Sequence, residues 1–529
     1  MSSPALLLVL LLLPLVGGGA VLAVGRAAGD NAAKLTALGI SLLELVVAAV
    51  VWAGYSASKA SSGTRLQLTL STDWIRSFGV HFALGVDGIA LVMVALVGVL
   101  VPVVLLASWT HGAAEGELPE GRTFAGYFAM VLVMETFMMG VFLATDVFLF
   151  YVLFEGMLVP MYFLIGRWGG PRRQYAAMKF FLYSLLGGLV MLASLIGLYF
   201  ESVKIRGTGT FDWRELVAIA PQIPHTTQIW LFLGFFLAFA IKAPLVPLHT
   251  WLPDAGAEAP IGSAVLLVGV LDKVGTFGFL RYCLPLFPSA SRTLAPLVLV
   301  LAVLGVLYGA LVAVGQSDLK RWVSYTSIAH FGFIAVGVFA FTKQSGTGAV
   351  LYMVNHGIAT GLLFVVVGMI IARGGTRKIG DYHGMAKATP VLSGLFLLAV
   401  LCALALPGTN SFVSEFLVLL GSFPTQPVYT ILATVGIIFA ALYSLWIYQR
   451  VMQGPTGGTG IERARERGRL RDVTKLEVAV VAPLVVLILF LGFYPKPVLD
   501  VITPSVSATL TELGVAPEAV PAAVQGGLR

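Results

Sequence analysis

Two lysines of this 529-residue chain stand deep inside apolar stretches, where a cation is costly. Lys242 ends a long apolar run and is followed at once by Ala243 and Pro244. A lysine at the centre of a bilayer costs roughly 2.5–3.5 kcal/mol on insertion scales, and a proline interrupts the hydrogen-bond ladder of a helix. A cation beside a helix break, at membrane depth, indicates a buried site that water can reach rather than an ordinary span.

Further ionisable side chains fall at similar depths on separate apolar segments. At 1.5 Å per helical residue, Glu155 and His330, like Lys242 and Lys273, lie roughly 12–20 Å from the ends of their segments. This is near the middle of a hydrocarbon core about 30 Å thick. Such a layer of titratable groups is what lateral proton movement requires. The predicted proton-translocation set is Glu155, Lys242, Lys273, His330, His356 and Glu415.

The residue types suit proton transfer. Burial favours the uncharged form of a lysine or a carboxylate, and a neighbouring opposite charge restores the charged form. A pair of Glu155 with Lys242, if formed, would therefore keep the lysine protonated, and its separation would release the proton. His330 and His356 titrate nearest neutrality and could relay protons between sites.

Each of these residues also has a purely structural interpretation. Glu155 and Lys242 could be an ion pair that only joins two helices, and the two histidines could be core residues with satisfied hydrogen bonds. Asp272 and Lys273 are adjacent and point about 100° apart on a helix, so one could face a polar lumen while the other pairs locally. The weaker candidates are Glu44, Glu135, His249 and Asp254, for which helix–helix hydrogen bonds, caps or loop positions are the alternatives.

Composition identifies the class of protein. The chain is 58% hydrophobic and 11% charged, whereas globular chains average about 25% charged residues. We therefore predict an all-α polytopic membrane protein without a nucleic-acid partner, whose net charge of +7 reflects loop topology. The two cysteines cannot supply the four ligands that an iron–sulfur cluster usually needs, and we predict no catalytic, cofactor or metal residues. The fourteen apolar segments span about 4–24, 33–56, 87–109, 124–144, 147–166, 177–200, 229–252, 261–284, 293–315, 322–342, 348–372, 390–421, 427–450 and 477–495.

The loops indicate an orientation. With the first segment retained as a span, an outside N-terminus puts twenty Lys and Arg residues in cytoplasmic loops and eleven elsewhere. Since cytoplasmic loops are enriched in these residues, both termini are predicted on the outer side. Residues 451–475 form a charged cytoplasmic loop, and residues 476–529 contain the last helix and a short surface tail.

Two helix breaks suggest an internal repeat. The seventh segment contains IKAPLVPLH and the twelfth ALPGTNSFVSEF, five segments later. Helices 7 and 12 are thus predicted to be broken, each within a five-helix unit: helices 4–8 (124–284) and helices 9–13 (293–450). An odd number of spans makes consecutive units inverted. Residues 1–123 precede them as a three-helix segment.

Several stretches resemble the antiporter-like membrane subunits of respiratory complex I, the proton-pumping NADH:quinone oxidoreductase. They cover nearly the whole chain and are specific: FLFYVLFEGMLVPMYFLIGRWGG (148–170), FAIKAPLVPLHTWLPDAGAEAP (239–260), LLVGVLDKVGTFGFLR (266–281), SDLKRWVSYTSIAHFGF (317–333) and LALPGTNSFVSEF (404–416). The resemblance implies fourteen helices with two inverted five-helix repeats and two broken helices.

The resemblance also implies roles. Glu155 matches the glutamate of the fifth helix, Lys242 the lysine of the first broken helix and Lys273 the connecting lysine of the eighth. His330 matches the relay position on the tenth helix, His356 lies on the eleventh, and Glu415 matches the acidic residue of the second broken helix. Among the paralogous types, L and N are expected to carry lysine there and M glutamate, and type L adds a long lateral helix. Glu415 and the short tail therefore favour type M.

On this resemblance the chain is a membrane-arm subunit that provides one proton channel in a bacterial inner membrane. NADH, FMN, iron–sulfur clusters and quinone are then expected in partner subunits, and its neighbours would be the L-type and N-type subunits and lipids. The main alternative is a subunit of a multisubunit cation/proton antiporter. Membrane subunits of a hydrogenase or photosynthetic complex, and a structural scaffold, are more remote alternatives.

Overall fold

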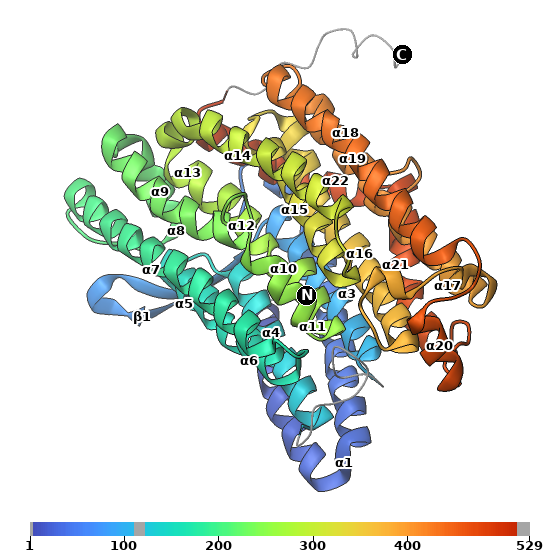
Figure 1. Ribbon diagram of the computed structural model, residues 1–529. Coiled ribbons are helices and arrows are strands. Elements are labelled where there is room, and N and C mark those ends of the chain that lie inside the picture. Colours follow the sequence, from blue (N-terminus) through green and yellow to red (C-terminus); the bar gives the residue numbers. More distant parts are fainter. Residues whose placement is uncertain (1–3, 110–121, 516–529) are drawn as a thin grey trace, which may run out of the picture.

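The structure, a computed structural model, describes residues 4–109 and 122–515. It is a bundle of helices (Figure 1), and within the described residues twelve helices are long and apolar enough to cross a membrane. Residues 1–3 and 110–121 of the predicted three-helix segment, and residues 516–529 of the predicted tail, lie outside the described residues. The spans are α1 (Ala5–Gly54), α3 (Gly88–Ala107), α4 (Phe124–Leu143), α5 (Val147–Gly156) with α6 (Leu158–Trp168), α7 (Arg173–Arg206), α9 (His225–Lys242), the segment Ile261–Leu286, α14 (Pro288–Val314), α15 (Leu319–Phe339), α16 (Lys343–Gly374), α19 (Pro427–Met452) and α21 (Lys475–Phe493).

The first of these, α1, is two helical arms that meet at Gly29. This glycine has φ 83° and ψ 176°, a region that side chains other than glycine rarely enter. The arms lie against each other, because a Cβ added at Gly17 would sit 2.7 Å from Ile40 Cγ2 and one at Gly25 would sit 3.4 Å from Ala33 Cβ. The apolar segments predicted at 4–24 and 33–56 are thus the two arms of one helical hairpin.

Two apolar segments contain breaks. The chain leaves α9 at Lys242 and re-enters a helix at α10 (Trp251–Glu258), where Pro244 and Pro247 cannot donate to a helical ladder. The second break separates α17 (Pro390–Ala403) from α18 (Asn410–Ser422). The backbone groups freed at such breaks need partners inside the protein, since lipid offers none.

The centre of the bundle is formed by α3, α15, α16 and the segment Ile261–Leu286, which is buried from Gly262 onwards. That segment consists of α11 (Ile261–Leu266), α12 (Lys273–Gly278) and α13 (Leu284–Leu286), separated by π-helical turns at Leu267–Leu271 and Phe279–Cys283. The outer helices α1, α7, α19 and α21 are mostly exposed, so their apolar faces are available to lipid or to other subunits. Lys273, His330 and His356 lie on these buried central elements, whereas Lys242 and Glu415 are buried residues of α9 and α18, and Glu155 is a half-buried residue of α5.

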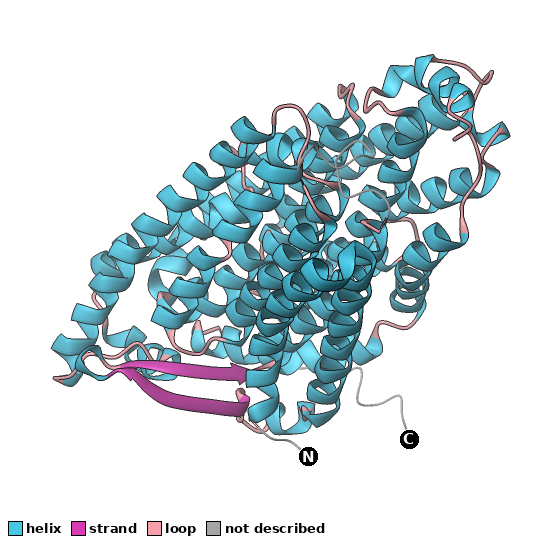
Figure 2. Cartoon of the chain, turned by 90° about the horizontal axis from the view of Figure 1, so that it is seen from below, coloured by secondary structure: helices cyan, strands magenta, loops and turns pink. Residues whose placement is uncertain are grey.

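Two features differ from the sequence-based expectation. A hairpin of β1 (Gln67–Ile75) and β2 (Val80–Val86) lies across one end of the bundle (Figure 2), in a stretch for which no strands were predicted. Residues after Pro495 were predicted to form a surface tail, but α22 (Lys496–Glu512) buries Val501, Ile502 and Val506. The prediction was wrong because α22 has one apolar face, which packs against α3 and α16.

A buried ion cluster anchors the hairpin and α22 to the bundle. Asp87 caps the start of α3 and accepts hydrogen bonds or ion pairs from Arg65 at 3.2 Å and Arg281 at 2.7 Å. Arg65 also binds Glu512 and, at 2.9 Å, Thr509 of α22. Removing one member of such a buried cluster leaves an uncompensated charge. The remaining elements are α2 (Ala57–Ser61), α8 (Trp213–Ile219), α20 (Thr459–Glu466) and short 3-10 turns at Arg76–Phe78, Ala220–Gln222, Ile379–Asp381 and Met385–Lys387.

Candidate functional site: a line of buried polar groups

Lys242 occupies the last turn of α9, where the helix breaks. Its side chain is completely buried, and its Nζ atom has no hydrogen-bond partner. The ammonium group lies 5.0 Å from the ring centre of Phe154 and 5.4 Å from that of Phe180. Aromatic faces stabilise a cation without accepting its protons, so the protons of Lys242 remain available for transfer.

Glu155 lies at the end of α5, with its carboxylate over Gly188 of α7. A Cβ added at Gly188 would stand 1.5 Å from Glu155 Oε1, so only glycine leaves room for this side chain. Both Glu155 Oε1 and Lys242 Nζ lack hydrogen-bond partners, so the predicted pair with Lys242 is open in this state. The two groups still interact electrostatically, as expected for charges separated by protein rather than by water.

Asp272 provides a second negative group beside Lys242. It is completely buried, both of its carboxylate oxygens lack partners, and it interacts electrostatically with Lys242 and Lys273. Lys242 therefore interacts electrostatically with two carboxylates, Glu155 and Asp272. Its interaction with both lysines gives Asp272 a larger part in the site than its sequence neighbourhood alone indicated.

Lys273 is held by the π-helical turn that precedes it. Its Nζ atom donates to the carbonyl of Val268 and lies 2.6 Å from His356 Nδ1. A π-helical turn changes the usual hydrogen-bond register of the backbone, and here the Val268 carbonyl accepts from a side chain. Because ammonium nitrogen can only donate, His356 accepts at Nδ1 and carries any proton of its neutral form on Nε2.

The line continues from His356 to the second helix break. The rings of His356 and His330 have their centres 5.2 Å apart. His330 Nδ1 lies 2.6 Å from Tyr352 Oη, and Tyr352 donates to Glu415 Oε2 at 2.8 Å. Since the tyrosine proton is used on Glu415, His330 Nδ1 is the donor to Tyr352. Lys273, His356, His330, Tyr352 and Glu415 thus form one line with a single gap, between the two histidines.

Sequence reasoning missed two members of this region, Tyr352 and Asn355. Tyr352 lies four residues before His356 on α16, and that spacing places both on one helix face. Asn355 donates to the Asn410 carbonyl at 2.7 Å and to Ser414 at 3.2 Å, and thereby holds the start of α18 beside α16. A polar residue at helical spacing from a predicted histidine was the available signal.

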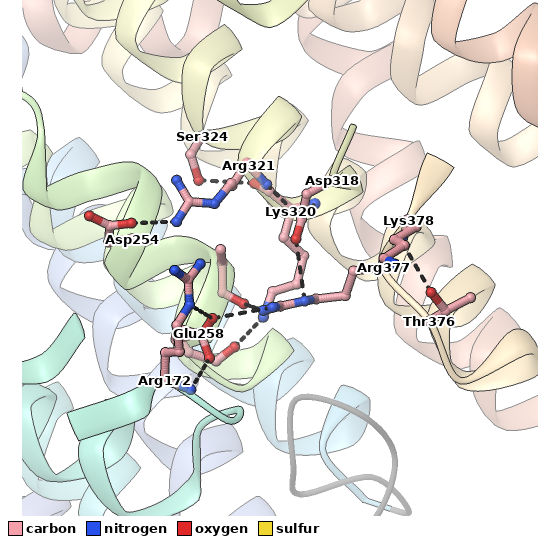
Figure 3. Close-up of polar contacts among 12 residues, drawn as sticks. Arg172, Asp254, Glu258, Asp318, Lys320, Arg321, Ser324, Thr376, Arg377 and Lys378 are labelled. Carbon is pink, nitrogen blue, oxygen red and sulfur yellow. Dashed lines mark hydrogen bonds and ion pairs between the residues drawn. The ribbon is translucent and has the colours of Figure 1, made fainter. Parts of the chain in front are cut away.

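The second half of the first broken helix is fixed by ion pairs rather than left free. Asp254, a weaker candidate, accepts from Lys179 of α7 at 2.7 Å and from Arg321 of α15. Figure 3 shows Arg321 reaching across to Asp254. His249 lies in the break, with Nδ1 unpartnered and its ring 5.0 Å from that of Tyr308. Asp254 therefore has the contacts of a structural anchor.

The same cluster joins α10 to the loop that follows α16. Glu258 accepts from Arg377 at 3.2 Å and from the backbone N–H of Arg172 at 3.0 Å (Figure 3). Arg377 also pairs with Asp318 at 3.3 Å, and Lys320 donates to the carbonyl of Ala259. These contacts connect the two predicted five-helix units at one end of the bundle. A movement of the first broken helix would therefore be transmitted to the second unit.

Glu44 and Glu135 form a separate group. Both are completely buried, on α1 and α4, and all four carboxylate oxygens lack partners. They interact electrostatically with each other, and no described hydrogen bond connects either one to Lys242 or Lys273. Among the described residues, no group of three or more histidine, cysteine, aspartate or glutamate side chains could hold a metal ion.

Comparison with known proteins places this arrangement in a family. The family model described as NADH:quinone oxidoreductase/Mrp antiporter, TM, matches residues 144–440. NADH-quinone oxidoreductase subunit M of Mycobacterium tuberculosis is 44% identical over 97% of this chain and 95% of its own length. The subunit M of Rhodobacter capsulatus is 38% identical over 95% of this chain and 96% of its own.

Two solved structures have the same fold as this chain. A chain of respiratory complex I from Thermus thermophilus with bound NADH superposes with a TM-score of 0.83 at 31% identity, over 96% of this chain and all of that one. A chain of the Mrp complex from Dietzia sp. has the same fold, with a TM-score of 0.80 at 21% identity over 97% and 99% of the two chains. The chain belongs to the NADH:quinone oxidoreductase/Mrp antiporter family of polytopic membrane proteins.

Proposed function

We propose that this chain is the M-type membrane subunit of a proton-pumping NADH:quinone oxidoreductase and provides one of its proton channels. The observation that carries the proposal is the line from Lys273 through His356, His330 and Tyr352 to Glu415, built from groups that accept and donate protons. It is supported by the subunit M relatives that align over nearly the whole chain. We expect the redox chemistry, with NADH, FMN, iron–sulfur clusters and quinone, to belong to its partner subunits.

The membrane topology extends the described spans. Counting α1 as two spans and α17 with α18 as one broken span gives the fourteen predicted. Helices within 124–284 and 293–450 form the two inverted units, and each unit contains one break. Both termini lie on the outer side of a bacterial inner membrane, as the cation bias indicates. The neighbours are the L-type and N-type subunits, with lipid around the exposed helices.

Proton movement starts from the open arrangement of Glu155 and Lys242. When Glu155 approaches Lys242, the ammonium form is stabilised; when it withdraws, burial favours release of the proton. Asp272, which lies within electrostatic range of both lysines, accepts the released proton or stabilises its passage to Lys273. The driving change must come from a partner that binds the two states unequally, which fits a subunit without redox chemistry of its own.

From Lys273 the proton passes along fixed contacts. Lys273 gives a proton to His356 Nδ1, and the histidine releases its other proton from Nε2 toward His330. His330 then donates at Nδ1 to Tyr352, whose proton moves to Glu415. The gap between the imidazole rings needs a water molecule or a ring rotation, since no hydrogen bond spans it. That gap is where the line can be interrupted between pumping steps.

The direct test is Lys242→Ala in the intact complex. NADH oxidation and proton uptake are measured together in inverted membrane vesicles, and assembly is measured by native electrophoresis. We expect assembled complex with little proton uptake, because the lysine proposed to supply protons to Lys273 is lost. Normal uptake by a normally assembled variant would reject the channel, and loss of uptake without loss of assembly would reject a purely structural scaffold.

The shared fold with the Mrp complex supports a second candidate, a subunit of a multisubunit cation/proton antiporter. Purification of the assembly and mass spectrometry of its subunits separate the two. NADH- and flavin-binding partners support the oxidoreductase, whereas an assembly of membrane subunits alone, with cation-dependent proton exchange and no NADH oxidation, would support the antiporter.

A further inference from the structure

A groove of about 670 Å³ opens on the outer surface of the bundle, away from the polar line. Its walls come from the first arm of α1, the first half of α4 and the end of α6, and Figure 1 shows these helices side by side. This volume falls within the range of about 300–1,000 Å³ that is usual for small-molecule sites. The groove is therefore large enough to hold part of a lipid.

The groove exists because its walls carry small side chains. A Cβ added at Gly25 would lie 2.5 Å from Ala125 Cβ, so the helices meet closely near the corner of the α1 hairpin. At Gly19, by contrast, an added Cβ would meet nothing within 4 Å. Gly19 lines the groove, and its missing side chain leaves the space open.

The lining changes from apolar to cationic along the groove. Leu15 and Val133 lie toward one end, and Arg26 and Arg167 lie toward the other, near the hairpin corner. Leu15 and Arg26 are eleven positions apart on one helix, which is roughly 16 Å of rise, or about half of a 30 Å hydrocarbon core. The groove thus has the length and polarity of one membrane leaflet.

The cationic end has unpaired positive charge. Arg26 and Arg167 are exposed, and neither forms an ion pair within residues 4–109 and 122–515. The neighbouring carboxylate, Asp30, accepts the backbone N–H of Ala125 at 3.3 Å. The Arg167 guanidinium lies 5.2 Å from the ring of Trp168, a residue type enriched at membrane interfaces.

We propose that this groove binds an anionic phospholipid, with one acyl chain between α1 and α4 and the phosphate beside Arg26 and Arg167. Basic pockets at the ends of membrane helices bind anionic headgroups, and the apolar wall requires a hydrocarbon chain rather than a free phosphate. The site is independent of the proton line and of the function proposed for it.

The test compares substitutions in the intact, purified complex. Gly19→Leu puts a side chain into the groove, and Gly39→Leu is its matched control, because Gly39 is on the same helix, also meets nothing within 4 Å, and does not line the groove. Each complex is equilibrated in detergent with phosphatidylglycerol or phosphatidylcholine and washed, and retained lipid is counted by native mass spectrometry. A double variant, Arg26→Gln with Arg167→Gln, keeps the groove and removes its charge.

We expect wild type and Gly39→Leu to retain one more phosphatidylglycerol per complex than Gly19→Leu. The double arginine variant should lose about fivefold in phosphatidylglycerol affinity for each cation removed, with phosphatidylcholine unaffected. Equal retention by Gly19→Leu and Gly39→Leu would overturn the proposal, and so would equal uptake of both lipids by wild type. A photo-crosslinker at Leu22 that joined a neighbouring subunit instead of lipid would show the groove to be a protein interface and would likewise overturn it.

Discussion

Replacement of Tyr352 by phenylalanine removes one oxygen atom from the middle of the polar line and almost nothing else. The hydroxyl joins His330 Nδ1 at 2.6 Å to Glu415 Oε2 at 2.8 Å. Without it, the nitrogen and the carboxylate oxygen are up to about 5.4 Å apart, well beyond hydrogen-bond range. A proton arriving at His330 then has no fixed partner on the way to Glu415.

The magnitude follows from the hydrogen bonds that are lost. A hydrogen bond to a charged group is worth about 1.5–3 kcal/mol, and each 1.4 kcal/mol added to a barrier slows a step about tenfold. Loss of the bond to Glu415 alone should therefore slow proton passage tenfold or more. His330 and Glu415, which stay buried without this partner, should also lower the free energy of unfolding by about 1–3 kcal/mol.

The assay is the initial rate of proton uptake per NADH oxidised in inverted vesicles. Tyr282→Phe is the matched control, because Tyr282 is also completely buried but its hydroxyl has no hydrogen-bond partner. The control should pump like wild type. If assembled Tyr352→Phe complex pumped at the wild-type rate, the hydroxyl would not be part of the proton path, and the line would have to run elsewhere.

Three further predictions test other parts of the site. Gly188→Ala puts a methyl group where Glu155 Oε1 lies and should lower proton uptake with assembly retained. Gly394→Ala is the control, because its added Cβ meets open space, and it should leave uptake unchanged; equal uptake by the two variants would show that the position of Glu155 is unimportant. Glu415→Lys replaces the acceptor of Tyr352 by a cation and should block uptake, so a fully active variant would contradict the need for an acid at this break. Asp254→Asn and Lys179→Gln should couple by about 1 kcal/mol in a double-mutant cycle of thermal unfolding; additive effects would mean that their 2.7 Å contact adds no stability.

Several buried ionisable groups of the site have no hydrogen-bond partner. Lys242, Asp272 and one oxygen of Glu155 lack hydrogen bonds, although buried polar groups are usually satisfied because leaving them unpaired costs energy. A closed ion pair would hold its protons firmly. Open, mutually sensitive charges instead allow a small movement to change which group is protonated.

The sequence by itself predicted how deep each group lies and which residue types share that depth. The apolar segment around a residue sets its position along the membrane normal, so Lys242, Lys273 and His330 could be assigned to the middle of their spans before any helix was placed. The two breaks were likewise readable, because proline and glycine act on the backbone locally. Matching motifs then indicated the family, and the relatives confirmed it.

Only the tertiary structure decided which of these groups touch. Contact depends on how helices rotate and pack, and those choices are made by distant residues: Gly188 makes room for Glu155, and the π-helical turn at Leu267–Leu271 aims Lys273 at Val268 and His356. For the same reason Tyr352 was missed, and the buried packing of α22 was not predicted. Depth is a property of one helix in a bilayer, whereas a proton path is a property of several helices packed together.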